Sequence, residues 1–299
     1  MTTPRRAATR EEIHTYYTES FPAHIDTLPS FITAVGPKEY ALAFREAYPV
    51  RKQGAPDRTF IRRETWQTNK SGDRLTKQFN SIDELIEFIQ YPARHDPLQG
   101  SNYALADPDL LERPEPRPDA VYYALDHWER PWVLAVDIDA KDIAARRAAS
   151  GAEPTTESTK QVDSEHLRET RIVDSAPEGY PYAFADIEQA LEYGFAVQEI
   201  FEDDFAATET MVVYSGQGCH VYLLDTDHKH RYDEQSREVI NDLLLEEYEI
   251  PIDPVVTADR RRVMRLPYSL HADVSRVVQP IQSPDFDFRT EAIPSFLTT

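Results

Sequence analysis

Three short segments of the chain carry side chains that could act together on a phosphorylated substrate. The first is an apolar run that ends in Asp137 and Asp139, and the second is Ser215-Gly216-Gln217-Gly218-Cys219-His220. The third starts at Asp253 and ends in Arg265-Leu266-Pro267-Tyr268-Ser269-Leu270-His271. Carboxylates that hold divalent metal ions, combined with cations that contact phosphate, are the groups that nucleotidyl transfer uses.

The Asp-x-Asp pair follows the stretch 132–136, whose apolar side chains predict a buried strand. Side chains alternate between the two faces of a strand, so Asp137 and Asp139 share one face. Two neighbouring carboxylates repel each other unless a cation lies between them, and their hard oxygen atoms favour Mg²⁺ or Mn²⁺. A solvated strand end in an acidic protein is the alternative interpretation.

The two later segments add groups suited to phosphate. Gly216 and Gly218 allow positive φ angles and a close approach of the backbone to a ligand, and His220 follows at the start of the next expected strand. Arg265 can make a bidentate phosphate contact, and His271 adds a second imidazole. A histidine that only packs in the core remains the alternative for both imidazoles.

In order and spacing, these segments resemble the catalytic subunit of archaeal and eukaryotic DNA primases. That family shows a hydrophobic Asp-x-Asp, a Ser-Gly-x-Gly-x-His, and an Asp 18 residues before the His of a Leu-Pro-x-Ser-Leu-His-like segment; Asp253 and His271 are 18 residues apart. Two upstream stretches, 38–42 and 79–85, are more faintly similar to the family. The spacing favours Asp253 as the third carboxylate, and it leaves Asp259 as a salt-bridge partner for the adjacent arginines.

The resemblance implies an α/β (α+β) fold, with a central sheet of RNA-recognition-motif type and an N-terminal α/β module. Residues 1–299 would form one catalytic domain, with the module at about 1–125 and the metal- and nucleotide-binding core at about 126–285. A polar stretch at about 150–180 would be a surface insertion. The implied activity is template-directed synthesis of a short RNA or DNA primer.

The same resemblance implies roles for individual residues. Two Mg²⁺ or Mn²⁺ ions would be held by three aspartates: Asp137, Asp139 and Asp253. The triphosphate of the incoming nucleotide would be bound by five residues: Ser215, Gly216, His220, Arg265 and His271. The implied partners are nucleoside triphosphates, a single-stranded DNA template, and a primase large subunit or another replication protein. Gln217 departs from the family, because many members have a basic residue in this turn.

A single cysteine, Cys219, rules out internal disulfides and any multi-cysteine zinc site. Many primase catalytic subunits carry a zinc knuckle between the first two motifs, so no structural zinc is expected here. Three alternative functions remain open. They are a primase-like polymerase of repair or of plasmid or virus replication, an inactive nucleic-acid-binding homologue that acts as a scaffold, and an unrelated metal-dependent phosphohydrolase.

The charge balance opposes nucleic-acid binding at first sight, because 53 acidic residues outnumber 32 basic ones and give a net charge of −21. In molar salt, however, the Debye length falls to about 3 Å, and only close contacts count. We therefore interpret the acidity as the adaptation of a halophilic archaeon; a mesophilic acidic protein is the alternative. Basic residues do cluster, at 260–265, where phosphate contacts are expected, and at 58–77. The cluster at 58–77 and the insertion at 150–180 are the candidates for contacting template or partner.

Apolar periodicity and capping residues predict the elements around the motifs. The expected helices are 9–20, 82–91, 141–149, one that ends at Gly194, and 233–247. The expected strands are 132–138, 210–214, 220–224 and 261–266, the last at an edge of the same sheet as the others. Nothing approaches the roughly 18 apolar residues of a membrane span, and the chain start lacks a signal region, so a soluble cytoplasmic protein without membrane partners is expected.

Overall fold

The computed structural model describes twelve parts of the chain. They are residues 8–29, 32, 40–48, 58–62, 67–68, 74–75, 120–124, 133–149, 182–225, 232–259, 262–271 and 274–297. The predicted helix at 82–91 and the predicted insertion at 150–180 lie outside the described residues. No described helix is both long enough and apolar enough to cross a membrane.

The chain divides into two compact units. The N-terminal unit consists of Ala8–Ala124 and Val263–Ala272, and the main unit consists of Met1–Ala7, Leu125–Arg262 and Asp273–Thr299. After Ala124 the chain builds most of the main unit. It then returns to the N-terminal unit for the ten residues Val263–Ala272, and Asp273–Thr299 belong to the main unit again. The third motif is divided by this return, because Asp253 belongs to the main unit and Arg265 to the N-terminal unit.

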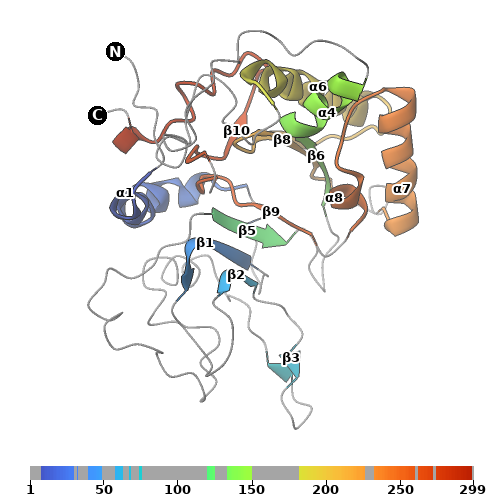
Figure 1. Ribbon diagram of the computed structural model, residues 1–299. Helices are drawn as coiled ribbons and strands as arrows, with labels where there is room; N and C mark the ends of the chain where they lie inside the picture. Colours follow the sequence, from blue (N-terminus) through green and yellow to red (C-terminus); the bar gives the residue numbers. More distant parts are fainter. Residues whose placement is uncertain are drawn as a thin grey trace. The chain divides into compact units, whose positions relative to one another are not determined.

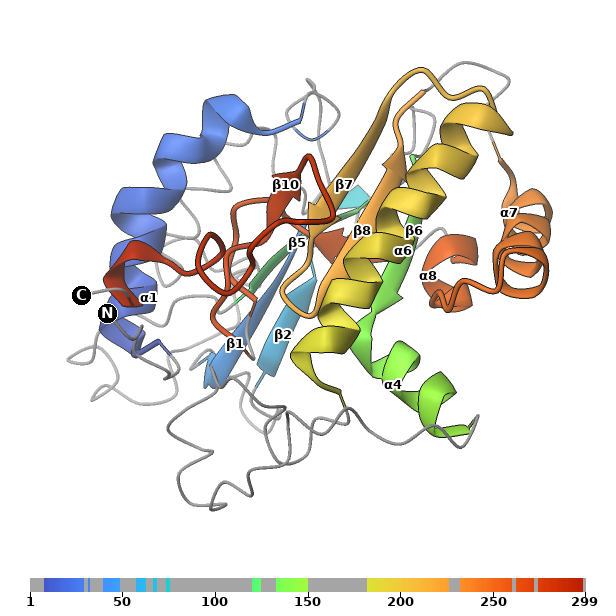
Figure 2. The ribbon, with the colours of Figure 1, turned by 90° about the horizontal axis from the view of Figure 1, so that it is seen from above.

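The main unit contains a four-stranded antiparallel sheet in the order β10-β7-β8-β6 (Figure 1 and Figure 2). The strands are β6 (Leu134–Asp139), β7 (Thr210–Tyr214), β8 (Gly218–Leu223) and β10 (Gln279–Ile281). In the register of β6 with β8, Asp137 lies opposite His220, and Asp139 lies opposite Gly218. The first two motifs are thus neighbours in the sheet.

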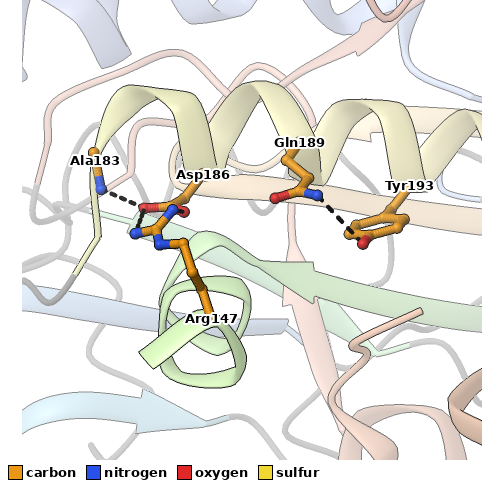
Figure 3. Close-up of polar contacts among 5 residues, drawn as sticks. All are labelled: Arg147, Ala183, Asp186, Gln189 and Tyr193. Carbon is orange, nitrogen blue, oxygen red and sulfur yellow. Dashed lines mark hydrogen bonds and ion pairs between the residues drawn. The ribbon is translucent and has the colours of Figure 1, made fainter. Parts of the chain in front are cut away.

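Two helices pack on this sheet, α4 (Ala140–Ala149) and α6 (Phe184–Asp203), and α6 runs along one face (Figure 2). Buried side chains of the helices and strands form one apolar core, with Val136, Leu191 and Val221 among its members. Figure 3 shows how the helices are tied together. Arg147 of α4 donates two hydrogen bonds to the buried Asp186 of α6, one of 3.0 Å, and Asp186 also accepts from the Ala183 amide.

The predicted end of a helix at Gly194 is wrong, because α6 continues to Asp203. Gly194 lies inside the helix and faces the sheet. A Cβ atom at this position would lie 2.4 Å from the Sγ atom of Cys219 on β8. The glycine therefore allows the helix to approach the strand closely, and it does not mark a helix end. Sequence alone does not separate these two uses of glycine.

The second half of the main unit carries α7 (Glu234–Asp242), a π-helical turn over Leu243–Glu247, and α8 (Pro254–Ala258). The prediction of a helix over 233–247 is confirmed, and Asp233 caps it by accepting a hydrogen bond from the Ser236 amide. The short helix α8 follows Pro251 and begins at Pro254, and it packs against both α7 and β6.

The N-terminal unit begins with α1 (Arg10–Thr15), a π-helical turn at Tyr16–Ser20 and a 3₁₀ helix at Phe21–Thr27. The predicted capping box is present, because Thr9 and Glu12 each bond the backbone amide of the other. Its sheet has the order β2-β1-β5-β9 (Figure 1). The strands are β1 (Tyr40–Tyr48), β2 (Arg58–Arg62), β5 (Ala120–Ala124) and β9 (Val263–Arg265); a separate pair joins β3 (Gln67–Thr68) to β4 (Arg74–Leu75).

The expected α/β (α+β) class is confirmed, because helices combine with antiparallel sheets in both units. The predicted strand at 261–266 exists as β9 and lies at a sheet edge. Its assignment to the same sheet as 132–138 is wrong, because β9 pairs with β5 of the N-terminal unit and sets Arg265 opposite Tyr122. A strand's own sequence fixes which side chains face the core, but it does not fix which distant strand becomes its neighbour.

Candidate functional site

The end of β6 presents two carboxylates on one face of the sheet. Leu134, Val136 and Ile138 point into the core and are fully buried, so Asp137 and Asp139 point to the opposite face. Their side chains are 14% and 16% exposed. Both acids are therefore largely removed from water, although their oxygen atoms remain within reach of a small ion.

His220 is buried beside Asp137, and its Nε2 lies 3.5 Å from the Oδ1 atom of that aspartate. On the other side of the ring, Nδ1 lies 3.1 Å from the hydroxyl of Tyr222. When the tyrosine hydroxyl donates to Nδ1, the imidazole proton resides on Nε2 and faces the site. Tyr222 thereby sets the direction in which His220 can donate.

A lysine stands among the acids. The Nζ atom of Lys141, at the start of α4, lies 2.5 Å from Oδ2 of Asp139. Burial would lower the pKa of Lys141, but its hydrogen bond to Asp139 and the charges of Asp139, Asp142 and Asp137 outweigh burial and raise the pKa. The ammonium group is thus held in its charged form by three carboxylates.

Asp142 links these groups to the third motif. Burial raises the pKa of Asp142, Lys141 opposes this, and the negative charges of Asp139 and Asp253 raise the pKa further. We call Asp137, Asp139, Asp142 and Asp253 the acidic cluster. Its members come from the end of β6, the first turn of α4 and the start of α8. Like charges gathered in this way favour a cation.

Asp253 is fixed at the start of α8 by two hydrogen bonds. Its amide donates to the carbonyl oxygen of Asp137 at 2.9 Å, and its Oδ1 accepts from the Val255 amide at 2.9 Å. Asp259 lies at the other end of α8, roughly 9 Å further along at 1.5 Å per residue, and forms an ion pair with Arg262 at 3.5 Å. The structure therefore brings Asp253, and not Asp259, next to β6.

Two buried polar residues of α7 hold α8 in place, and the sequence analysis did not identify them. Arg237 donates to the carbonyl oxygens of Thr257, at 3.1 Å, and Val133, at 3.3 Å. Asn241 donates to the carbonyl oxygen of Pro254 at 2.8 Å. The i, i+4 spacing of Arg237 and Asn241 on the apolar face of the helix was the available signal, because polar groups are buried there only when they have partners.

The acidic cluster has the chemistry of a magnesium or manganese site, because it offers hard carboxylate oxygens at low exposure. In the present arrangement, however, no three Asp, Glu, His or Cys side chains of the described residues are close enough to hold an ion. Lys141 already neutralises Asp139. The chemistry of the donor set therefore fits a divalent ion, whereas the arrangement of the described side chains is that of a carboxylate group paired with a lysine.

The Ser215–Gly218 turn closes over the end of β6. Gly216 has a φ of 107°, which favours glycine, and its carbonyl accepts from the Tyr214 hydroxyl at 2.7 Å. The Ala140 amide donates to the carbonyl of Gln217 at 3.0 Å, and a Cβ on Gly218 would lie 2.0 Å from the Ile138 carbonyl oxygen. Both glycines predicted to matter in this turn therefore have a structural reason.

Two side chains of the turn keep unused hydrogen-bonding atoms. Within the described parts of the chain, the buried Oγ of Ser215 and the buried Nε2 of Gln217 have no hydrogen-bond partner. Each such atom carries a desolvation cost of about 1–3 kcal/mol unless a ligand satisfies it. The turn thus has the open donors that an anion would need.

The remaining predicted residues, Arg265 and His271, belong to the N-terminal unit. Arg265 is on β9, and His271 is buried after the turn in which the Ser269 amide donates to the Leu266 carbonyl at 3.0 Å. Whether these two residues share a ligand with the acidic cluster stays a prediction.

Two adjacent tyrosines hold the segment that carries His271. The hydroxyl of Tyr16 donates to the Tyr268 carbonyl, and the hydroxyl of Tyr17 accepts from the Leu270 amide at 3.1 Å. Tyr268 has a φ of 66°, and its ring stacks on His24 with 4.5 Å between the centroids. These contacts fix the backbone immediately before His271.

Comparison with known proteins points to archaeal primases. No protein-family model matches the chain. An uncharacterised DNA primase small subunit-like protein of Archaeoglobus fulgidus is 39% identical over 89 residues, which cover 29% of this chain and 30% of that protein. The DNA primase small subunit of Pyrobaculum calidifontis is 24% identical over 213 residues, or 58% of this chain and 63% of that protein. The chain is therefore similar to archaeal primase small subunits, and it matches less than two thirds of the length of either relative.

Proposed function

We propose that the chain is a metal-dependent nucleotidyltransferase of primase type, which synthesises a short RNA or DNA primer on a single-stranded DNA template. The acidic cluster is the observation that carries this proposal. It joins Asp137 and Asp139 at the end of β6 to Asp253, whose amide bonds the Asp137 carbonyl. The similarity to archaeal primase small subunits supports the same activity, with a large subunit or another replication protein as a partner.

In this proposal, Asp137, Asp139 and Asp253 hold two Mg²⁺ or Mn²⁺ ions. When bound, such ions lower the pKa of the attacking 3′-hydroxyl and offset charge on the leaving pyrophosphate. Lys141, which is paired with Asp139 without metal, would be displaced from Asp139 by a bound ion, and its ammonium group could then contact phosphate. The metal roles of the aspartates explain why acids are kept at a place where burial makes them costly.

The proposal also assigns the groups that bind the triphosphate. Ser215 donates its open hydroxyl, Gly216 lets the backbone approach, and His220 donates from Nε2. From the N-terminal unit, Arg265 and His271 supply a cation and an imidazole. A charge-assisted hydrogen bond to phosphate contributes about 1.5–3 kcal/mol, so a few such groups suffice for nucleotide binding.

The test is nucleotide incorporation in molar KCl with Mn²⁺, labelled nucleotides and a single-stranded DNA template, with and without an annealed primer. Mn²⁺ binding is followed in parallel by electron paramagnetic resonance. We expect Asp137→Asn and Asp253→Asn to lose at least tenfold in incorporation, because metal ions contribute several kcal/mol to the transition state. Synthesis without a primer identifies a primase, and activity that needs a primer identifies a polymerase that only extends.

Asp259→Asn is the matched control, because it removes the same charge at the other end of α8, where Asp259 forms an exposed ion pair with Arg262. We expect it to retain most of the activity. A wild-type protein that neither binds Mn²⁺ nor incorporates nucleotides would refute the proposal. A larger loss in Asp259→Asn than in Asp253→Asn would show that the third acid had been assigned to the wrong aspartate.

A further inference from the structure

Among the described residues of the main unit, a buried arginine has no anionic partner. Arg276 precedes β10, and only 6% of its surface is exposed. Its Nη1 atom is buried without a hydrogen-bond partner in the described chain, and no described carboxylate forms an ion pair with it. Burial lowers the pKa of Arg276, and Tyr214 is the group whose charge opposes this. An unpaired guanidinium at this depth is costly unless a ligand brings the missing negative charge.

The sheet register leads the segment that carries Arg276 toward the end of β7 from which the Ser215–Gly218 turn begins. In the antiparallel pairing of β10 with β7, Gln279 lies opposite Tyr214. Because the two strands run in opposite directions, the residues before Gln279 continue alongside the residues after Tyr214, which are those of the turn. The electrostatic interaction of Arg276 with Tyr214 places the guanidinium at the same end of β7.

The backbone on both sides of Arg276 is held in place. Ser275 is buried and adopts a φ of 50°, and the Val277 amide donates to the Ala292 carbonyl at 2.8 Å. The side chain therefore starts from a fixed position on the sheet. Its burial is a property of the folded unit, and it does not result from an exposed loop that happens to lie against the surface.

The turn and Arg276 together contribute three unsatisfied polar atoms, which are Ser215 Oγ, Gln217 Nε2 and Arg276 Nη1. All three can donate a hydrogen bond, and one carries a positive charge. A ligand that satisfies them must offer several acceptor oxygens and a negative charge, as a phosphate group does. Gln217 itself is neutral, so the turn depends on another residue for its cation.

We propose that Arg276, with the Ser215–Gly218 turn, binds a phosphate group of the incoming nucleoside triphosphate. Arg276 thereby supplies the cation that Gln217 does not provide. The identity of the ligand as a nucleotide rests on the proposed function, whereas the site for a phosphate group rests on the buried donors alone. The position of the turn over the end of β6 places this phosphate next to the acidic cluster, where a metal-bound triphosphate belongs.

The experiment measures binding of inorganic triphosphate, a nucleoside triphosphate and a single-stranded DNA oligonucleotide by titration calorimetry, at fixed molar KCl. Arg276→Gln is compared with Arg276→Lys, which keeps the charge, and with Ser215→Ala, which removes only the hydroxyl. We expect Arg276→Gln to weaken triphosphate and nucleotide binding at least tenfold, the usual effect of losing a charge-assisted hydrogen bond. Arg276→Lys and Ser215→Ala should lose less, and DNA binding should not change.

Stability gives an independent readout. Without ligand, Arg276→Gln should melt at the same temperature as the wild type or higher, because it removes an unpaired buried charge. Arg289→Gln is the matched control in the same segment, since Arg289 is a surface cation paired with Glu188 at 2.7 Å. It should leave triphosphate binding unchanged.

Four outcomes would overturn the inference. They are absence of triphosphate binding in the wild type, unchanged triphosphate affinity in Arg276→Gln, a lower melting temperature with unchanged affinity, and loss of DNA binding alone, which would assign Arg276 to the template backbone.

The failure of the proposed function is distinguishable from these outcomes. A wild type that binds triphosphate through Arg276 but incorporates no nucleotide would retain the phosphate site and refute the polymerase activity. An active enzyme whose Arg276→Gln variant keeps its nucleotide KM would retain the polymerase activity and refute the phosphate site.

Discussion

The contact between Gly194 and Cys219 predicts that an alanine in the middle of α6 destabilises the main unit. Alanine is favoured over glycine in a helix by about 1 kcal/mol, so Gly194→Ala would stabilise an unhindered helix. Here, the new Cβ would lie 2.4 Å from Cys219 Sγ and 3.5 Å from Val212 Cγ1. Both neighbours are buried in the core, and overpacking of this kind costs about 1–3 kcal/mol. The difference between these two terms is a net loss of up to about 2 kcal/mol in the free energy of unfolding.

A double-mutant cycle separates the steric cost from other effects. In a Cys219→Ala background the sulfur is gone, so Gly194→Ala should become neutral or stabilising by up to about 1 kcal/mol. Unfolding by denaturant in molar KCl gives the four free energies. At the exposed Glu192, the difference between Glu192→Ala and Glu192→Gly calibrates the helix propensity within the same helix. If Gly194→Ala is equally destabilising in both backgrounds, the contact with Cys219 does not explain the glycine.

Two further predictions concern the support of the site and the salt dependence of the fold. Asn241→Ala removes the donor to the Pro254 carbonyl, so we expect the free energy of unfolding to fall by about 1–3 kcal/mol and kcat for incorporation to fall as well. Val239→Ala is the control, because Val239 is 62% exposed, and it should change neither quantity. Far-ultraviolet circular dichroism should show that cooperative unfolding is lost as KCl falls below about 1 M, because repulsion among the excess acids opposes compaction. Full stability in dilute buffer would instead favour a mesophilic origin.

Local signals in the sequence predicted local structure well. The capping box at Thr9 and Glu12 satisfies amides within one turn, so its geometry follows from neighbouring residues alone. The apolar run before Asp137 determined both the strand and the face on which the two acids emerge. The hairpin of β7 and β8 was predictable for the same reason, because two short strands flank a glycine-containing turn.

Features that depend on distant contacts were not predictable. β9 pairs with β5, from which more than a hundred residues separate it, and nothing within β9 specifies that neighbour. The partners of Arg237 are the carbonyls of Val133 and Thr257, and neither is specified by the helix that carries the arginine. Arg276 is another case, because only the pairing of β10 with β7 leads its segment toward the turn. In each case the deciding interaction joins segments that folding brings together.

The position of Lys141 bears on how the acidic cluster exists without metal. Several carboxylates at low exposure repel one another, and the ammonium group offsets part of that repulsion from 2.5 Å away. The lysine side chain is itself 54% exposed, and ion pairs of such exposure contribute only about 0.2–1 kcal/mol. In the proposed function, Lys141 therefore stabilises the metal-free cluster only weakly, and a divalent ion that binds the aspartates would displace it.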